Sequence, residues 1–525
     1  MSLKRIRLND ISNGISPTEN EYAPGTFKMS MGIDPDAAAN NALNSPRASG
    51  IIKPVGYTKF SSTGLSGYPK WLLSTNKNER IYAYASDGEL ISYSSALTAA
   101  SEVVEGTPTS GVGNGAIFYQ DYVWLATPTE LSRFGTISGG SPTIANTWWN
   151  GTAGLTLLTN TVYPAFRGLT LPNHAMHLHG DNAVYFCDVN SSGQGIINKL
   201  KVDSSGNDSG SVYNALDLPF GFLPTDIESF GGDLAVSAVQ MAASVTNPII
   251  KQGNSYVFFW DTVNDSYYNA VTIPDPFTTA LKNVNGRLYA FSGNAEAGCR
   301  VLEYAGGDTF NQVAFFEEMN SPFPGAVDAY AERLAFGGYV TYPTTEAVVF
   351  ALGSKNKRSA GIGLQCPIRC TSSGTTPIVT AVAQLQHLDG KTPRFIVGWG
   401  SASAFGIEKY SSGASLFSRF LTPKWEFPGR FSVVELRITL EKAITSAVYI
   451  TPIAYIDDGD TTQVSLDVIN NTNFPGKKVI VCKRPGTKIA GNRNFFIDFE
   501  FTGTSNVGIT EIEALVEVTD AIKTA

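Results

Sequence analysis

Charged residues are scarce in this sequence. They make up 16% of the 525 residues, against about 25% in an average domain. The formal net charge is -8, which argues against a protein that binds phosphate backbones, because nucleic-acid affinity depends on clustered Lys and Arg. Ser, Thr, Asn and Gly are abundant instead, which predicts a neutral polar surface suited in part to contact with other subunits.

Cysteines and long apolar runs are also few. Cys187, Cys299, Cys366, Cys370 and Cys482 are odd in number and scattered, which argues against a disulfide framework and favours folding in a reducing cytosol. No apolar run reaches the length of about 18 residues that a membrane-spanning helix needs. The opening MSLKRIRLND has basic residues but no apolar stretch behind it, so no signal peptide is expected.

Turn formers and aromatic residues are plentiful. The chain has 51 Gly and 27 Pro, and 11% of its residues are aromatic, a composition typical of many short strands joined by tight turns. The clearest hairpin spans 278–293, where Asn285 and Gly286 favour a type I′ turn between two alternating strands. Similar hairpins are predicted at 71–95, 116–127, 175–189, 226–238, 326–340 and 379–400. The sequence therefore predicts an all-β fold.

The hairpins recur irregularly, with a mean spacing on the order of 50 residues, which is the period of a four-stranded propeller blade. We expect an irregular β-propeller of six to eight blades, with seven the best count. Known repeat signatures are missing, since Trp260-Asp261 is a lone Trp-Asp pair.

Four segments are predicted along the chain. Residues 1–50 form a polar, extended N-terminal arm that is loose or lies on a neighbour, and 51–410 form the propeller. Residues 411–428 are a linker, and 411–421 favour one short helix. Residues 429–525 contain six alternating strands, which predict an antiparallel β-sandwich.

Two groups of residues resemble metal sites. His174, His177 and His179 lie close in sequence, but on a strand His174 faces away from the other two, and nothing at a fixed spacing completes a tetrahedral set. Cys366 and Cys370 are one residue too far apart for a redox or zinc pair. We interpret the first group as ordinary blade positions and the second as buried thiols.

Further candidates are weaker still. Asp457, Asp458 and Asp460 lack the spacing of a calcium loop and favour a hairpin turn. Adjacent Glu317 and Glu318 point to opposite faces of a strand and cannot flank one bond. The remaining candidates are His387 beside Asp389, which has no serine elbow to complete a triad, and the basic run 355–358, interpreted as a solvated loop. No catalytic residue, metal site or cofactor is predicted.

Trp148 and Trp149 form the most notable aromatic pair. A loop is expected to hold them, and exposed aromatic rings stack on sugars or anchor interfaces. Packing between blades is an equally good interpretation. They are the candidate glycan or interface residues.

The order of parts resembles the tail proteins of short-tailed bacteriophages that form the tube or nozzle beneath the portal and adaptor rings. The matching stretch is 40–60, NNALNSPRASGIIKPVGYTKF, followed by the hairpins above. The usual Arg-Pro-Gly entry is absent, and only Ser45-Pro46-Arg47 and Lys53-Pro54 stand there. The resemblance implies a ring, commonly of six subunits, with an acidic channel through which DNA passes, and adaptor, portal-side and fibre proteins as partners.

Three hypotheses follow. The first is a structural virion protein of a phage tail, assembled in host cytoplasm and without a reaction of its own. The second is a glycan-binding propeller for host attachment that uses Trp148 and Trp149. The third is a propeller hydrolase of polysaccharide, with carboxylates brought together across blades.

Overall fold

The computed structural model describes most of the chain in segments. The described residues are 2–8, 14–15, 26–27, 29–31, 55–61, 65–75, 77–109, 111–128, 130–146, 148–149, 165–166, 169–170, 174–190, 192–240, 254–294, 298–316, 319, 321–330, 333–340, 345–352, 364–385, 394–412, 417–446, 448–457, 463–483, 489–502 and 507–519. They form two compact units. The ring unit comprises 59–349 and 370–409, and the terminal unit comprises 1–58, 350–369 and 410–525.

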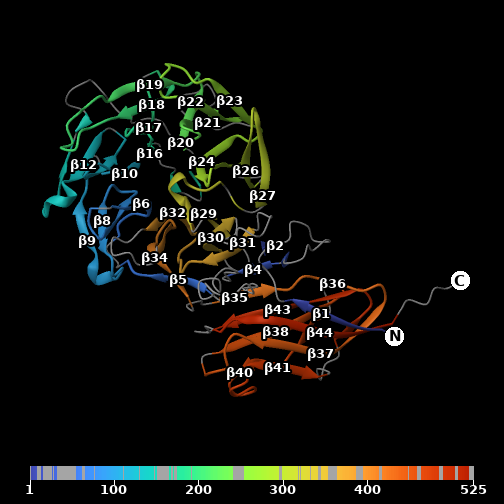
Figure 1. Cartoon of the computed structure of the whole chain (residues 1–525). Coiled ribbons are helices and arrows are strands. Elements are labelled where there is room, and N and C mark those ends of the chain that lie inside the picture. Colours follow the sequence, from blue (N-terminus) through green and yellow to red (C-terminus); the bar gives the residue numbers. More distant parts are fainter. Residues whose placement is uncertain are drawn as a thin grey trace. The chain divides into compact units, whose positions relative to one another are not determined.

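The ring unit consists of antiparallel sheets that follow one another along the chain (Figure 1). The first sheet contains β6 (Pro69–Ser74), β7 (Arg80–Ala85), β8 (Leu90–Ser94) and β9 (Val103–Gly106). The second contains β10 (Gly115–Tyr119), β11 (Tyr122–Ala126), β12 (Leu131–Gly135) and β13 (Thr143–Ala145). The third contains β16 (Met176–Leu178), β17 (Val184–Val189), β18 (Gly195–Leu200) and β19 (Val212–Asp217). Two short 3-10 helices, η2 (Ala99–Ser101) and η3 (Ile137–Gly139), and a small hairpin, β14 (Ala165–Phe166) and β15 (Leu169–Thr170), lie between these strands in sequence.

Four further sheets complete the unit. They are β20 (Phe222–Phe230), β21 (Asp233–Gln240), β22 (Ser255–Trp260) and β23 (Asn269–Ile273); β24 (Phe277–Val284), β25 (Arg287–Asn294), β26 (Gly298–Gly306) and β27 (Thr309–Phe316); β28 (Val327–Tyr330), preceded by η5 (Pro324–Ala326), with β29 (Arg333–Val340) and β30 (Glu346–Leu352); and β32 (Ile378–Leu385), β33 (Arg394–Gly400), β34 (Phe405–Ser412) and β5 (Val55–Lys59).

The first strand of each sheet, here called its inner strand, contacts the inner strand of the next sheet. The contacts run from β6 through β10, β16, β20, β24, β28 and β32, and β32 contacts β6 again. This closed cycle is a β-propeller, so the predicted all-β propeller class is confirmed. The boundary between the units cuts β5, β30 and β34, and the blade count of seven stays a prediction.

Burial patterns explain why these sequences form blades. Middle strands such as β11 and β17 are buried at every position, because each sheet is covered on both faces by its neighbours. The predicted turn at Asn285 and Gly286 is confirmed, with φ of 54° and 79°. Positive φ at both central residues defines a type I′ turn.

The terminal unit contains two larger antiparallel sheets. The first has the order β1 (Ser2–Leu8), β44 (Ile509–Thr519), β37 (Arg430–Leu440) and β41 (Val479–Lys483), with β42 (Ala490–Gly491) also on β37. The second has the order β39 (Gln463–Ser465), β38 (Tyr449–Ile456), β43 (Asn494–Thr502), β35 (Phe417–Leu421) and β4 (Met29–Met31), with β36 (Trp425–Glu426) on β43 and β40 (Ile469–Asn470) on β38. A further strand, β31 (Leu364–Arg369), pairs with β2 (Gly14–Ile15), which pairs with β3 (Thr26–Phe27).

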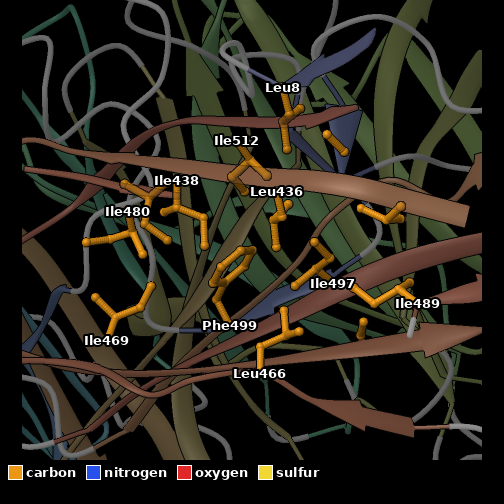
Figure 2. Close-up of a cluster of buried hydrophobic side chains, with 14 of the residues drawn as sticks. Leu8, Leu436, Ile438, Leu466, Ile469, Ile480, Ile489, Ile497, Phe499 and Ile512 are labelled. Carbon is orange, nitrogen blue, oxygen red and sulfur yellow. The ribbon is translucent and has the colours of Figure 1, made fainter. Parts of the chain in front are cut away.

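Several strands of this unit alternate between buried and partly exposed positions, as in β38 and β44. Such alternation leaves one face of each sheet in solvent and buries the other. The buried side chains of both sheets form one hydrophobic cluster, in which Leu436 and Ile512 of the first sheet accompany Ile497 and Phe499 of the second (Figure 2). The bounds predicted for a sandwich at 429–525 are not tested by this cluster, which also includes Leu8 and Phe420.

Two segments differ from the sequence-based expectation. The start of the predicted arm is a strand, because Ser2–Leu8 pairs with β44 in seven consecutive positions and Leu8 is buried. The short helix expected at 411–421 is wrong, since Phe417–Leu421 is strand β35, paired with β43. Among the described residues, no helix has the length and apolar character to cross a membrane.

Candidate functional site

A cavity of about 180 Å³ lies where the inner strands of the ring unit converge. Its lining comes from every inner strand of the cycle and includes Trp71, His177, Asp226, Glu228, Lys282 and Asp328. Three carboxylates, one amine and one imidazole thus meet in a small space. This group, called the axial cluster below, is the candidate site.

Lys282 is the centre of the axial cluster. Its Nζ lies 3.1 Å from Oδ1 of Asp328 and 3.7 Å from Oε2 of Glu228. Burial alone would lower the pKa of Lys282, but the two carboxylates outweigh burial and raise it above its usual value. Burial raises the pKa of Glu228, and Lys282 opposes that rise. The ammonium is therefore held charged between two acids.

Two of the acids also connect neighbouring inner strands. Asp226 of β20 accepts the backbone N–H of Leu281 in β24 at 2.8 Å, and Asp328 of β28 accepts that of Gln384 in β32 at 2.9 Å. Both carboxylates use one oxygen for the following residue of their own strand as well. Burial raises the pKa of Asp226 well above its usual value. The same contact, repeated in two places, holds sheets together.

Hydroxyl groups make equivalent contacts around the cycle. Thr225 of β20 donates to the carbonyl of Thr278 in β24, and Thr380 of β32 donates to the carbonyl of Pro69 in β6. Thr279 of β24 donates to the carbonyl of Pro322, just before η5. Buried polar groups gain little net energy from such bonds but lose heavily when left without them. The inner strands are thereby linked in register.

His177 on β16 and His179, the residue directly after β16, are brought together on one side as the sequence predicted. His177 Nε2 and His179 Nδ1 each lie 2.8 Å from the hydroxyl oxygen of Ser229. His177 Nε2 also accepts the backbone N–H of Ser229 at 3.2 Å and lies 3.8 Å from Glu228 Oε1. Burial, assisted by Lys282 and His179, lowers the pKa of His177 to about 3.

This arrangement does not form a catalytic triad. In a triad, one imidazole nitrogen faces the nucleophile and the other faces the acid, whereas His177 presents Nε2 to both Ser229 and Glu228. Glu228 and Asp328 also differ from the catalytic pair of a glycosidase. Such a pair needs two carboxylates that are free to flank a sugar bond, whereas Lys282 contacts both of these carboxylates. The charged and polar groups of the axial cluster thus pair with one another.

Trp148 and Trp149 lie in a packed aromatic cluster. The ring of Trp148 is 4.7 Å from that of Trp124, and the ring of Trp149 is 5.6 Å from that of Phe186. Trp149 is only 3% exposed and Trp148 is half-buried. The cluster joins β11 to β17, which is the packing interpretation of this pair. It leaves no open face on Trp149 for a sugar.

The other sequence candidates have structural surroundings or lie outside the described residues. His174 is buried, and its Nδ1 lies 2.9 Å from the carbonyl oxygen of Cys187, whereas His177 and His179 contact Ser229. Cys370 is a free, buried thiol whose pKa is raised by burial. Asp457 accepts the backbone N–H groups of Asn492 and Arg493. The candidates outside the described residues or their described side chains are Glu317, Glu318, Cys366, His387, Asp389, Asp458, Asp460 and the run 355–358.

Sequence reasoning missed the axial cluster and one other buried charge. Lys70 on β6 is 2% exposed, donates to Asn114 at 3.4 Å, and has its pKa lowered by burial to about 7. A signal was available, since Asp226, Glu228 and Lys282 are charged residues that alternate with Ile227, Leu281 and other apolar residues in β20 and β24. Among the described residues, no group of three or more His, Cys, Asp and Glu side chains has the arrangement of a metal site.

Comparison with known proteins finds likeness in solved structures alone. No protein-family model matches the chain, and no curated protein matches it. One similar structure is the propeller domain of Cps50 (Swd1) from Myceliophteria thermophila, with a TM-score of 0.41, 12% identity, and coverage of 68% of this chain and 100% of that one. The Dos1 propeller has a TM-score of 0.40 at 11% identity, covering 66% and 80%. A Bacillus subtilis family 43 arabinoxylan arabinofuranohydrolase has a TM-score of 0.30 at 12% identity, covering 88% and 98%.

Proposed function

We propose that this chain is a structural subunit of a bacteriophage tail, a ring former of the tube or nozzle type. In this role it forms part of the channel for genome ejection and a platform for other tail proteins, and it acts by assembly without a reaction of its own. The proposal draws on the order of parts along the chain and on its low, acidic charge.

Exposed apolar side chains on the outermost strands of the ring unit are the observation that carries this proposal. Val104 on β9 is 53% exposed, Val212 on β19 is 44% exposed, and Phe315 on β27 is 45% exposed. Each of these strands ends its sheet. Edge strands with apolar side chains offer unpaired backbone groups and a surface for a neighbouring chain.

The axial cluster supports the same function. Its charged groups pair with one another and with backbone N–H groups of neighbouring inner strands. A fully satisfied polar network rigidifies and specifies a single arrangement. Inner strands held together in this way suit a protein whose function lies at its surface.

Assembly of the full-length chain tests the proposal. A triple variant, Val104→Asp, Val212→Asp and Phe315→Asp, places charges on three outermost strands, and Val263→Asp is the matched control, since Val263 is 83% exposed in a turn. Native mass spectrometry should show a closed multimer for the parent and the control and a monomer for the triple variant. Equal assembly of all three proteins would refute a role for these edges, provided that circular dichroism shows all of them folded.

A further inference from the structure

Five aromatic side chains of the ring unit form a continuous group at one end of two neighbouring sheets, here called the aromatic patch. Its members are Phe230, Phe259, Tyr268, Tyr304 and Phe310. Adjacent ring centroids are between 4.9 Å, for Phe259 and Tyr304, and 6.5 Å, for Phe259 and Tyr268. Phe230 and Phe259 lie on β20 and β22, Tyr268 lies in the connection from β22 to β23, and the last two residues lie on β26 and β27.

Topology explains why these residues meet. In an up-and-down antiparallel sheet, the turn after the first strand and the turn after the third strand lie at the same end. Phe230 precedes the β20–β21 turn, Tyr268 ends the β22–β23 connection, and Tyr304 and Phe310 flank the β26–β27 turn. The side-chain amide of Asn269 donates to the carbonyl of Gly307 at 3.3 Å, which connects the two turns.

One side of the patch is buried in the sheets, and the other side is exposed to solvent. Phe259 is 3% exposed, whereas Tyr268 is 60% exposed. Tyr304 and Phe310 are half-buried and pack against the core of the two sheets. Large aromatic rings with a fixed base and open faces are preferred anchors in recognition, because little side-chain entropy remains to be lost on binding.

Carboxylates lie close to the two tyrosines of the patch. Asp233 accepts the hydroxyl of Tyr268 at 2.7 Å, and Asp261, at the other end of the β22–β23 connection, accepts the backbone N–H of Val263. The pKa values of Tyr268 and Tyr304 are raised by burial first and by carboxylates second, Asp233 and Asp261 for Tyr268 and Asp308 for Tyr304. These acids create a negative potential over rings whose faces are themselves negative.

We propose that the aromatic patch is a docking site for an arginine or lysine side chain of a partner protein. A cation over Tyr268 or Tyr304 gains from the ring face and from Asp233 and Asp308 together. An anionic partner would be repelled by the same groups, and a neutral one would gain nothing from the charge. The ring unit uses this chemistry internally, where the guanidinium of Arg133 lies 4.5 Å from the ring centroid of Tyr122. The site is independent of the proposed tail function.

A pair of peptides that differ only in charge tests the proposal. The probes are acetyl-(Gly-Arg)4-amide and its citrulline counterpart, which has nearly the same size and no charge, each labelled with fluorescein and titrated with the full chain. Fluorescence anisotropy should show binding of the arginine peptide, weaker binding at high salt because exposed charges are screened, and little binding of the citrulline peptide. Binding of both peptides with equal affinity, or of neither, would overturn the proposal.

Three variants locate the site. Tyr268→Ala removes the most exposed ring and should weaken the arginine peptide by about two- to fivefold, the equivalent of an exposed cation–π contact. Asp233→Asn keeps the shape and should weaken it comparably, while Phe220→Ala, which removes a 72% exposed ring elsewhere in the ring unit, should have no effect.

Two outcomes of this series would overturn the proposal. An equal loss of arginine-peptide binding in Phe220→Ala would place the binding elsewhere. Binding of maltoheptaose to the parent that is lost in Tyr268→Ala would identify the patch as a saccharide site instead.

Discussion

Replacement of Lys282 by Met is the sharpest perturbation of the axial cluster. It removes the ammonium that contacts both Glu228 and Asp328 and leaves two acids without their counter-charge. Loss of one partner of a buried pair costs about 3–5 kcal/mol. The side chains of Lys282 and Asp328 are each 25% exposed, so solvent screening reduces the expected loss to about 2–3 kcal/mol of unfolding free energy.

Urea denaturation followed by circular dichroism at pH 5 and pH 8 measures this loss. Without Lys282 the pKa of Glu228, already raised by burial, rises further, so protonation at pH 5 removes part of the unpaired charge and the loss is smaller there than at pH 8. In a double-mutant cycle, adding Glu228→Gln should restore part of the unfolding free energy that Lys282→Met loses. Arg287→Met is the control, because its pair with Glu303 is 56% exposed on the arginine side and is worth at most about 1 kcal/mol. A loss no larger than that of the control, or no rescue, would refute the account of the cluster.

Three further substitutions test buried titratable groups by urea denaturation across pH. Asp226→Asn should gain stability relative to the parent as pH rises above about 4, since the raised pKa of Asp226 makes the native state hold a proton that the unfolded state releases; a difference independent of pH would contradict this. His177→Gln should lose less stability than the parent as pH falls from about 6.5, at a rate of up to about 1.4 kcal/mol per pH unit, because the native pKa of His177 is about 3; identical acid profiles would count against it. Lys70→Met should be more stable than the parent at and below pH 7 and lose that advantage toward pH 10, because the native pKa of Lys70 is about 7; an advantage that grows with pH would be the wrong sign.

Much of the fold could be predicted because its signals are local. The Asn285-Gly286 turn needs two residues with positive φ, and the sequence supplies the pair that adopts them most readily. The alternation of β44 is visible in the sequence as well, since Glu513 and Glu517 stand between buried apolar residues. The strand at Ser2–Leu8 was missed because its partner, β44, lies at the other end of the chain, and no local pattern states which distant strand will cover an edge.

The candidate site could be predicted only in part. The shared face of His177 and His179 follows from strand periodicity, but their common partner Ser229 lies on another sheet. Asp226, Lys282 and Asp328 come from three inner strands, and their meeting depends on the packing of three consecutive sheets against one another. The sequence could not decide whether Trp149 is exposed on a loop or packed between sheets, because exposure depends on how the sheets assemble. In the structure, Trp149 packs in a hydrophobic cluster with residues of β11 and β17.

Native mass spectrometry of the purified full-length chain, with negative-stain imaging, tests the central claim most directly. Residues 2–8 must be retained, because they form a strand of the terminal unit. The account predicts a closed multimer with rotational symmetry, which the charged triple variant of Val104, Val212 and Phe315 converts to a folded monomer. A parent chain that remains monomeric across the micromolar range and is indistinguishable from the triple variant would contradict it.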